Sequence, residues 1–442
     1  MTDHLSLELF IDPAQQGEYL LLPFTMPAGV ERLELRYEYP RRPASTGPLA
    51  GGTYTSRAEA NIIDLGLIAP DGEQVGASGS DKLEITVSEV SATAGYRPCK
   101  LVPGEWQILA GAYKVAPQGV TVRYELRFHF KATRLYRGDL HTHTLASDGV
   151  LTAAELAQRA RRHGLDFLAI TDHNQPVSHL ELPQVDGLTL IPGVEWTHYR
   201  GHANFLGVDR PYDGSFHANS EDEIRQRFVS ARQRGALITI NHPFDECCGF
   251  QLDMGSLPWD CLEIWNGPMR ESNLRALGLW QQLLAAGKKV PIVGGSDYHR
   301  DTPFIFPGGP TTCVYAASAS AADLLAAVRA GHAYLTFAPG APRLAFTAGG
   351  AQMGDTAAWP DVEAVHIELQ DLQAGDLLRA VTAEGSRDIV RAPEDSAFEV
   401  DLPVTGPGFV RLEVWRTFIP GVPALPALIS NPIYFEQGEA VK

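Results

Sequence analysis

Cysteine is scarce in this sequence, and its arrangement excludes two common uses of thiols. The chain has 442 residues and only 5 cysteines, and no C-x-x-C pair is among them. An odd number of cysteines in a long chain is typical neither of a disulfide framework nor of a thiolate zinc site. We therefore expect reduced thiols in a cytoplasmic protein. Cys247 and Cys248 follow a histidine-containing motif and are interpreted as inert buried thiols.

Basic residues are also few. Lys and Arg number 36 against 53 Asp and Glu, which gives a formal net charge of −17. A field of this sign repels polyanions. The composition therefore predicts a small-molecule substrate and no nucleic-acid partner.

Long apolar runs are missing. No stretch of 18 apolar residues occurs that could span a bilayer, and the first residues lack a basic start followed by an apolar segment. We expect no membrane association, no signal peptide and a cytoplasmic location. The oligomeric state is left open.

Hydrophobic periodicity divides the chain into three regions. Up to about residue 134, alternating segments such as 30–39, 105–115 and 120–130 predict strands of an antiparallel β-sandwich. Between residues 135 and 337, short apolar strands alternate with helical segments. Alternation of this kind indicates parallel pairing in an α/β layer or barrel. Residues 338–442 return to β patterns and predict a second β-sandwich-like domain.

The middle region contains clear helix boundaries. Thr152 is followed three residues later by Glu155, and Ser220 by Glu223, which are capping boxes. Two further helices are expected over 271–287 and 320–331. The chain is thus predicted to be of the α/β class in its centre.

The segment GDLHTHTLASDG, residues 138–149, raises the question of function. Alternate residues of a strand point to one face, so His141 and His143 share a direction. Two converging imidazoles suit a metal ion better than an apolar core, in which their polar nitrogens need partners.

Further histidines and carboxylates follow other strands of the middle region. Because the carboxyl ends of parallel strands form one face, most of these groups should converge there. Nine side chains with nitrogen and oxygen donors predict two to three divalent ions, with Zn²⁺, Mn²⁺ or Fe²⁺ as candidates. The candidate ligands are His141, His143, Asp148, His173, Glu195, His202, His242, Asp297 and His299.

The order H-x-H-x4-D-G, TDH, GVE, NHP and GSDxH resembles the PHP (polymerase and histidinol phosphatase) superfamily over roughly residues 135–337. This resemblance implies a distorted (β/α)7 barrel with a trinuclear metal site and, in most members, phosphoester hydrolysis. The flanking β regions, GHANFLG and the ending ISNPIYF resemble a subgroup that contains a carbaryl hydrolase, a carbamate-cleaving enzyme.

The resemblance also implies a ligand assignment. The first ion is held by His141, His143, Glu195 and Asp297, the second by Glu195, His202 and His242, and the third by Asp148, His173 and His299.

The expected activity is that of a metal-dependent hydrolase that uses a metal-bridging hydroxide, most simply a phosphoesterase on a small organic phosphate. Glu195 and Asp297 are expected to act at the reacting centre, and Arg300 to contact the substrate. One alternative is hydrolysis of a carbamate, ester or amide. A second is a non-catalytic binding protein on a PHP scaffold.

Overall fold

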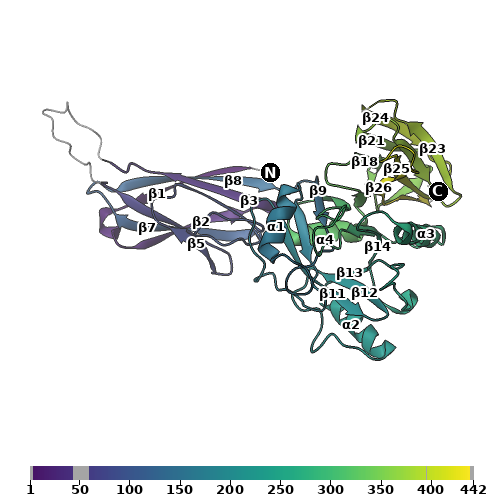
Figure 1. The fold of residues 1–442 in the computed structure, drawn as a ribbon. Coiled ribbons are helices and arrows are strands. Elements are labelled where there is room, and N and C mark those ends of the chain that lie inside the picture. The colour runs from purple at the N-terminus through teal and green to yellow at the C-terminus, as the bar shows by residue number, and fades with distance from the viewer. Residues whose placement is uncertain (1–2, 43–58, 395, 439–442) are drawn as a thin grey trace. The chain divides into compact units, whose positions relative to one another are not determined.

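The computed structural model describes residues 3–42, 59–394 and 396–438 (Figure 1). The chain divides into two compact units, Met1–Ala132 and Thr133–Lys442. The predicted division into three domains, 1–134, 135–337 and 338–442, stays a prediction.

The first unit consists of antiparallel strands in two four-stranded sheets, ordered β1-β8-β3-β6 and β2-β7-β4-β5. Alternate residues of β7 and β8, such as Trp106 and Tyr124, are fully buried and belong to one hydrophobic core. The β-sandwich assignment itself stays a prediction. The elements are β1 His4–Ile11, a 3-10 turn Pro13–Gln15, β2 Tyr19–Met26, β3 Val30–Glu38, β4 Ile62–Ile68, β5 Gln74–Ser78, β6 Glu84–Ser88, β7 Gly104–Lys114 and β8 Val120–Phe130.

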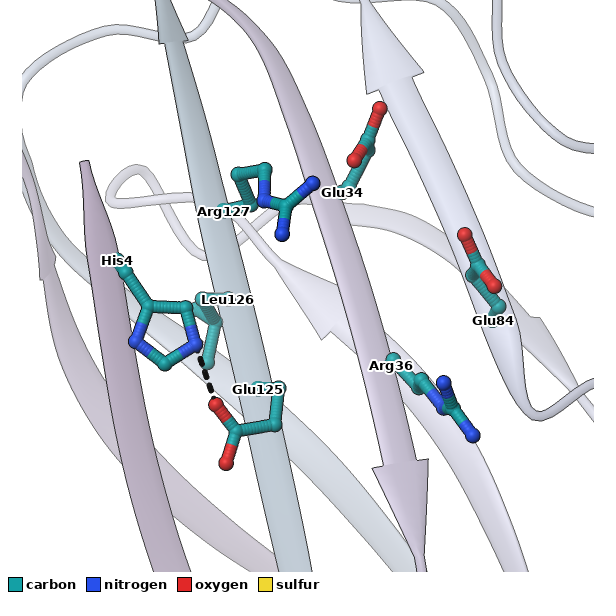
Figure 2. Close-up of a pocket in the computed structure, with 7 residues that line it drawn as sticks. All are labelled: His4, Glu34, Arg36, Glu84, Glu125, Leu126 and Arg127. Atoms are coloured by element: carbon teal, nitrogen blue, oxygen red, sulfur yellow. Dashed lines mark ion pairs between the residues drawn. The ribbon is translucent and has the colours of Figure 1, made fainter.

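Opposite charges face one another across the strands on one face of this unit (Figure 2). Glu34 pairs in register with Arg127, and Arg36 with both Glu125 and Glu84. Cross-strand pairs of opposite charge stabilise a sheet and keep its outer face solvated. These side chains line a surface pocket, and strand pairing accounts for their charges.

The first half of the second unit alternates strands with four α-helices in its described part. Thr152 and Ser220 form the predicted capping boxes with Glu155 and Glu223. The elements are β9 Arg134–Asp139, α1 Ala153–Arg162, β10 Phe167–Ile170, β11 Thr189–His198, β12 Gly201–Leu206, α2 Glu221–Gln233, β13 Leu237–Ile240, a 3-10 turn Met254–Ser256, β14 Cys261–Asn266, α3 Glu271–Ala285, β15 Ile292–Gly295, β16 Thr311–Ala316, α4 Ala321–Ala330 and β17 Ala333–Thr336.

Strand pairing here is mixed rather than parallel throughout. β9, β10 and β11 are parallel neighbours, as are β13, β14 and β15. β12 runs antiparallel to both β11 and β13. The reason is local, because only Tyr199 and Arg200 separate β11 from β12, and a connection this short permits a hairpin but not a parallel crossover.

The predicted (β/α)7 barrel is not confirmed, because the described strands do not form a closed ladder. The order runs openly from β15 through β14, β13, β12, β11, β10 and β9 to β16. Between β15 and β16, the Thr312 hydroxyl takes the place of a backbone partner. Its Oγ1 accepts from the Gly294 amide at 3.0 Å and donates to the Gly294 carbonyl at 2.7 Å. The Thr312 side chain thus bonds to the amide and the carbonyl of Gly294, which a continuous β-ladder between β15 and β16 would use for backbone pairing.

The remaining strands continue the same sheet and add a second one. β17 pairs with β26, so the large sheet runs on through β25, β22 and β23, with β27 and β20 branching from β25. A four-stranded sheet has the order β19-β18-β21-β24. Figure 1 places β18, β21, β24, β25 and β26 together. The bounds are β18 Arg343–Ala348, β19 Ala351–Gln352, β20 Thr356–Trp359, β21 Ala364–Leu372, β22 Leu377–Val381, β23 Ser386–Arg391, β24 Ser396–Pro403, β25 Gly408–Arg416, β26 Leu425–Ser430 and β27 Ile433–Gln437.

The fold as a whole is a sheet-rich α/β arrangement with few helices. None of the helices in the described ranges combines the length and the apolar character that crossing a membrane requires.

Candidate metal centre

The structure brings the nine predicted ligand residues together from five segments of the second unit. They occur in overlapping groups in which the donor atoms all lie within 4.8 Å of one another. The segments follow β9, β10, β13 and β15 or form the hairpin of β11 and β12. The segments contribute, in chain order, His141 with His143 and Asp148, His173, Glu195 with His202, His242, and Asp297 with His299.

Backbone pairing beyond the ends of β9 and β15 places the first histidines. The amide of Asp297 donates to the carbonyl of His141, and the amide of His143 donates to the carbonyl of Tyr298, both at 2.9 Å. Thr142, between the two histidines, directs its hydroxyl to the Ala169 carbonyl on the opposite side. This alternation leaves both imidazoles on the face of Asp297, as the sequence predicts.

The hairpin of β11 and β12 supplies two more groups. Glu195 is fully buried on β11, and His202 lies opposite Thr197 near the turn. The short turn therefore returns the chain so that a residue opening β12 lies beside the carboxyl end of β11.

Glu195 is the centre of the cluster. Its Oε1 lies 3.2 Å from both His202 Nδ1 and His242 Nε2, and 3.3 Å from His141 Nε2. Its Oε2 lies 2.9 Å from His173 Nδ1 and 3.5 Å from His143 Nε2. A single buried carboxylate is thus contacted by imidazoles on both of its oxygens.

Two aspartates complete the arrangement. Asp297 Oδ1 lies 3.0 Å from His143 Nε2 and 3.4 Å from His141 Nε2. The more exposed Asp148 lies 3.2 Å from His299 Nε2 and 3.7 Å from His173 Nε2. Asp148, which lies in the segment between β9 and α1, is therefore close to the two histidines with which the motif groups it.

Hydrogen bonding in this cluster is incomplete without cations. Among the described residues, ten buried side-chain polar atoms make no contact with hydrogen-bond geometry, and five of them are in this cluster, although four of these five lie within ion-pair distance of neighbouring imidazoles or carboxylates. These five are His141 Nε2, His143 Nδ1 and Nε2, Glu195 Oε2 and Asp297 Oδ1. Buried polar atoms are almost always paired in folded proteins. Nitrogen and oxygen donors aimed at a shared space fit divalent metal ions, whose identity and number the side chains do not fix.

Neighbouring charges shift the pKa values of the buried carboxylates and of His141. Burial raises the pKa of Glu195, but His141 and the other imidazoles hold it well below its usual range. Burial likewise opposes ionisation of Asp297, yet His141 and His143 hold its pKa well below normal. Burial disfavours the charged form of His141, and Asp297 and Glu195 nevertheless raise its pKa well above the usual value. The carboxylates therefore stay ionised and attract positive charge.

Backbone conformation at two of the predicted ligands is unusual. His242 has φ of 25° and Asp297 has φ of 51°, in the region that favours glycine. Such conformations persist where surrounding structure fixes them, and they gather at functional sites.

Glu263, which sequence reasoning missed, and Cys248, which it interpreted as an inert thiol, contact the predicted ligands. Glu263 in β14 lies with Oε1 2.9 Å from His141 Nδ1, and its Oε2 accepts from the His242 amide at 2.9 Å. Cys248 places Sγ 3.7 Å from His242 Nδ1. The only sequence signal for Glu263 is a single carboxylate in an otherwise apolar strand.

Two arginines are candidates for substrate contact. Arg300, the predicted one, is exposed directly after His299. Arg270, which the sequence did not indicate, donates to Asn266 Oδ1 at 3.3 Å, and the Asn266 amide donates to Asp297 Oδ2 at 3.3 Å. Arg270 therefore lies two hydrogen bonds from a predicted ligand.

Comparison with known proteins gives partial matches. No protein-family model matches the chain. The chain is 37% identical over 109 residues to the 5'-3' exoribonuclease Rnm of Salmonella typhimurium, which covers 23% of this chain and 36% of that protein. It is 33% identical over 105 residues to the 3',5'-nucleoside bisphosphate phosphatase of Chromobacterium violaceum, which covers 22% of this chain and 36% of that protein. The matches thus span about a third of the length of these relatives.

Among solved structures, the chain is similar to a two-domain protein containing a predicted PHP-like metal-dependent phosphoesterase from Bacteroides vulgatus. The TM-score is 0.40 at 16% identity, and the match covers 67% of this chain and 95% of that chain. That protein is PHP-like by its description, and the motifs of the present chain resemble the same superfamily. The finer assignment to the carbaryl-hydrolase-like subgroup stays a prediction.

Proposed function

We propose that this chain is a metal-dependent phosphoesterase that acts on a small organic phosphate. The observation that carries the proposal is the set of buried nitrogen and oxygen atoms around Glu195, since five of them make no contact with hydrogen-bond geometry and bound cations would satisfy them. The predicted assignment of three ions stands as part of this proposal, with Glu195 shared between the first and the second.

The phosphoester bond is favoured by the relatives. Both curated relatives named above are, by their names, enzymes that act on phosphate esters. One of them is an exoribonuclease, so the expectation that nucleic acid is no partner is not confirmed. The substrate class proposed here therefore includes nucleotides and short oligonucleotides, although the net charge of −17 disfavours long polyanions.

Divalent ions bound here would lower the pKa of a coordinated water and neutralise charge that develops on a phosphoryl oxygen. The side chains of this chain would hold the ions and orient the substrate. Glu195, which is buried, and Asp297, which is partly exposed, contact the imidazoles around one space. Arg300 and Arg270 offer guanidinium groups that can pair with phosphate oxygens.

The alternatives differ in the bond that is cleaved or in the absence of catalysis. Hydrolysis of a carbamate, ester or amide would use the same ligands. A non-catalytic scaffold is disfavoured, because all nine motif positions carry donor side chains that meet in space.

A substrate screen on metal-loaded protein tests the proposal. The panel contains p-nitrophenyl phosphate, bis-p-nitrophenyl phosphate, a nucleoside 3',5'-bisphosphate, a short 5'-phosphorylated RNA and an aryl N-methylcarbamate. We expect hydrolysis of at least one phosphate ester, seen as release of p-nitrophenol, inorganic phosphate or a nucleotide, that is lost with chelator and restored by Mn²⁺ or Zn²⁺. Turnover of the carbamate alone would assign the protein as a carbamate, ester or amide hydrolase instead. Metal binding without any turnover would favour the scaffold.

A further inference from the structure

His242 contacts two different groups through its two ring nitrogens. Nε2 faces Glu195 Oε1 at 3.2 Å, within the cluster. Nδ1 lies 3.7 Å from Cys248 Sγ, and the same sulfur lies 3.4 Å from Asp245 Oδ1. These distances are within the range of hydrogen bonds that involve sulfur, which is both a weak donor and a weak acceptor.

Two other histidines of the cluster are held in the same orientation. His141 faces the carboxylates with Nε2 and has Glu263 Oε1 2.9 Å from Nδ1. His299 faces Asp148 with Nε2 and has the Asp297 carbonyl 2.8 Å from Nδ1. A metal-ligating histidine usually donates its second ring N–H to an acceptor, which fixes the ring and the tautomer. For His242 the group in that place is a thiol.

We propose that Cys248 is a positioning residue that orients His242 for metal binding by accepting a hydrogen bond from its Nδ1–H while donating its own S–H to Asp245. This inference rests on the assignment of His242 as a ligand made under the proposed function. It replaces the interpretation of Cys248 as an inert buried thiol, since Cys248 is half-buried and its neighbour Cys247 is exposed.

The loop that carries Cys248 is built to hold the thiol in place. The Asp245 amide donates to the His242 carbonyl at 3.0 Å. Asp245 Oδ1 in turn accepts from the amides of Cys247 at 2.9 Å and Cys248 at 3.4 Å. Gly249 closes the turn, where an added Cβ would lie 2.7 Å from the Asp245 carbonyl oxygen. Because one aspartate fixes both the backbone and the thiol, the sulfur is directed toward the ring rather than toward solvent.

The direct test compares Cys248→Ala, Cys248→Ser and the matched neighbour Cys247→Ala in the full-length protein. Zn²⁺ affinity is measured by titration against a competing chelator, and metal content by elemental analysis. We expect Cys248→Ala to weaken the binding of one ion by about 10- to 100-fold, the usual effect of losing such a partner. Cys248→Ser keeps a donor and an acceptor and should restore most of the affinity. Cys247→Ala should bind as the wild type does.

Two spectroscopic readouts separate positioning from other roles. In Zn²⁺-loaded protein, the Nδ1–H proton of His242, assigned by its loss in His242→Gln, should give a downfield NMR signal. That signal should shift or vanish in Cys248→Ala and stay unchanged in Cys247→Ala. Cys248 Sγ lies within 4.8 Å of donor atoms of both His202 and His242, so direct ligation is the rival role. Co²⁺-loaded wild-type protein should lack a sulfur-to-metal charge-transfer absorption band, because in this proposal the sulfur bonds to the ring and not to the ion.

The inference is overturned if Cys248→Ala binds all ions with wild-type affinity and leaves the ring proton in place. It is also overturned by a charge-transfer band that Cys248→Ser removes, since that band would make Cys248 a ligand. Both results concern metal binding and leave the choice of substrate untouched. Conversely, a metal-loaded wild-type protein that cleaves no substrate would refute the proposed function without affecting these measurements.

Discussion

The Glu263 carboxylate lies 2.9 Å from His141 Nδ1, and both side chains are almost fully buried. The other oxygen of Glu263 accepts from the His242 amide and from the Asn266 side chain. One carboxylate thus orients two predicted ligands of different ions. Glu263→Gln places an N–H₂ group against one of these donors, so we expect metal affinity to fall by about 10- to 100-fold.

The measurement is a metal titration against a chelator, with Glu271→Gln as the control. Glu271 is an exposed glutamate in the first turn of α3, so its substitution removes one charge at a distance from the cluster. Equal metal affinity in the two variants would show that Glu263 is not needed to orient His141.

Gly295 is the residue at which β15 approaches the first histidine motif. An added Cβ would lie 2.3 Å from His141 Cβ and 2.9 Å from the His141 backbone nitrogen. Backbone atoms cannot move aside as a flexible side chain can, so Gly295→Ala should displace His141. We expect lower metal content and a loss of stability of about 1–3 kcal/mol from overpacking.

Gly278 in α3 provides the matched control, because nothing lies within 4 Å of a Cβ added there. Gly278→Ala should keep full metal content and gain up to about 1 kcal/mol from helix propensity. Circular dichroism during chemical denaturation gives both stabilities. Wild-type metal content in Gly295→Ala would contradict the close packing against His141.

The motif residues could be predicted because their order and spacing in the sequence are distinctive. His141 and His143 alternate on one strand, and the helix starts at Thr152 and Ser220 have local capping signals. Glu263 has no such signal, since its role depends on β14 lying within reach of His141. Contacts between side chains distant in sequence do not appear in local patterns.

Strand direction and sheet closure were harder to predict for the same reason. The alternation of strands and helices favoured parallel pairing, yet the two-residue connection Tyr199–Arg200 makes β12 antiparallel. That signal was available in the sequence, because the apolar run containing Glu195 and the run starting near His202 are too close for a crossover. The hydrogen bonds between the Thr312 hydroxyl and the backbone of Gly294 have no local sequence signal and could only be seen in the structure.

A buried ion pair in the C-terminal part of the second unit should contribute measurably to stability. Arg416 donates to both carboxylate oxygens of Asp376, at 2.8 and 2.6 Å, and both side chains are buried. Arg416→Met leaves an uncompensated buried carboxylate, so we expect a loss of about 3–5 kcal/mol. Arg343→Met removes an exposed pair with Asp371 and should cost less than about 1 kcal/mol. Urea denaturation measures both variants, and similar losses would contradict the difference in burial.

Arg300 and Arg270 make distinguishable predictions for substrate binding. Arg300 follows His299 directly and is exposed, whereas Arg270 is linked through Asn266 to Asp297. A charge-assisted hydrogen bond to a phosphate oxygen contributes about 1.5–3 kcal/mol, so Arg300→Ala should raise KM for a phosphorylated substrate about 10-fold or more and leave bound metal unchanged. Arg270→Ala should raise KM as well if its guanidinium reaches the same phosphate.

The control for both arginine variants is Arg162→Ala, which removes an exposed guanidinium in the last turn of α1. All three variants lose one positive charge, so they weaken the long-range attraction of an anionic substrate equally. A larger rise in KM for Arg300→Ala or Arg270→Ala than for Arg162→Ala would therefore report direct contact with the substrate. Steady-state kinetics at saturating metal separate KM from kcat, and elemental analysis confirms equal loading. Arg300→Ala kinetics equal to those of Arg162→Ala would remove Arg300 from the site. If Arg270→Ala then raised KM alone, the anionic group of the substrate would lie on the side of Asn266, and the phosphate would approach the cluster past Asp297.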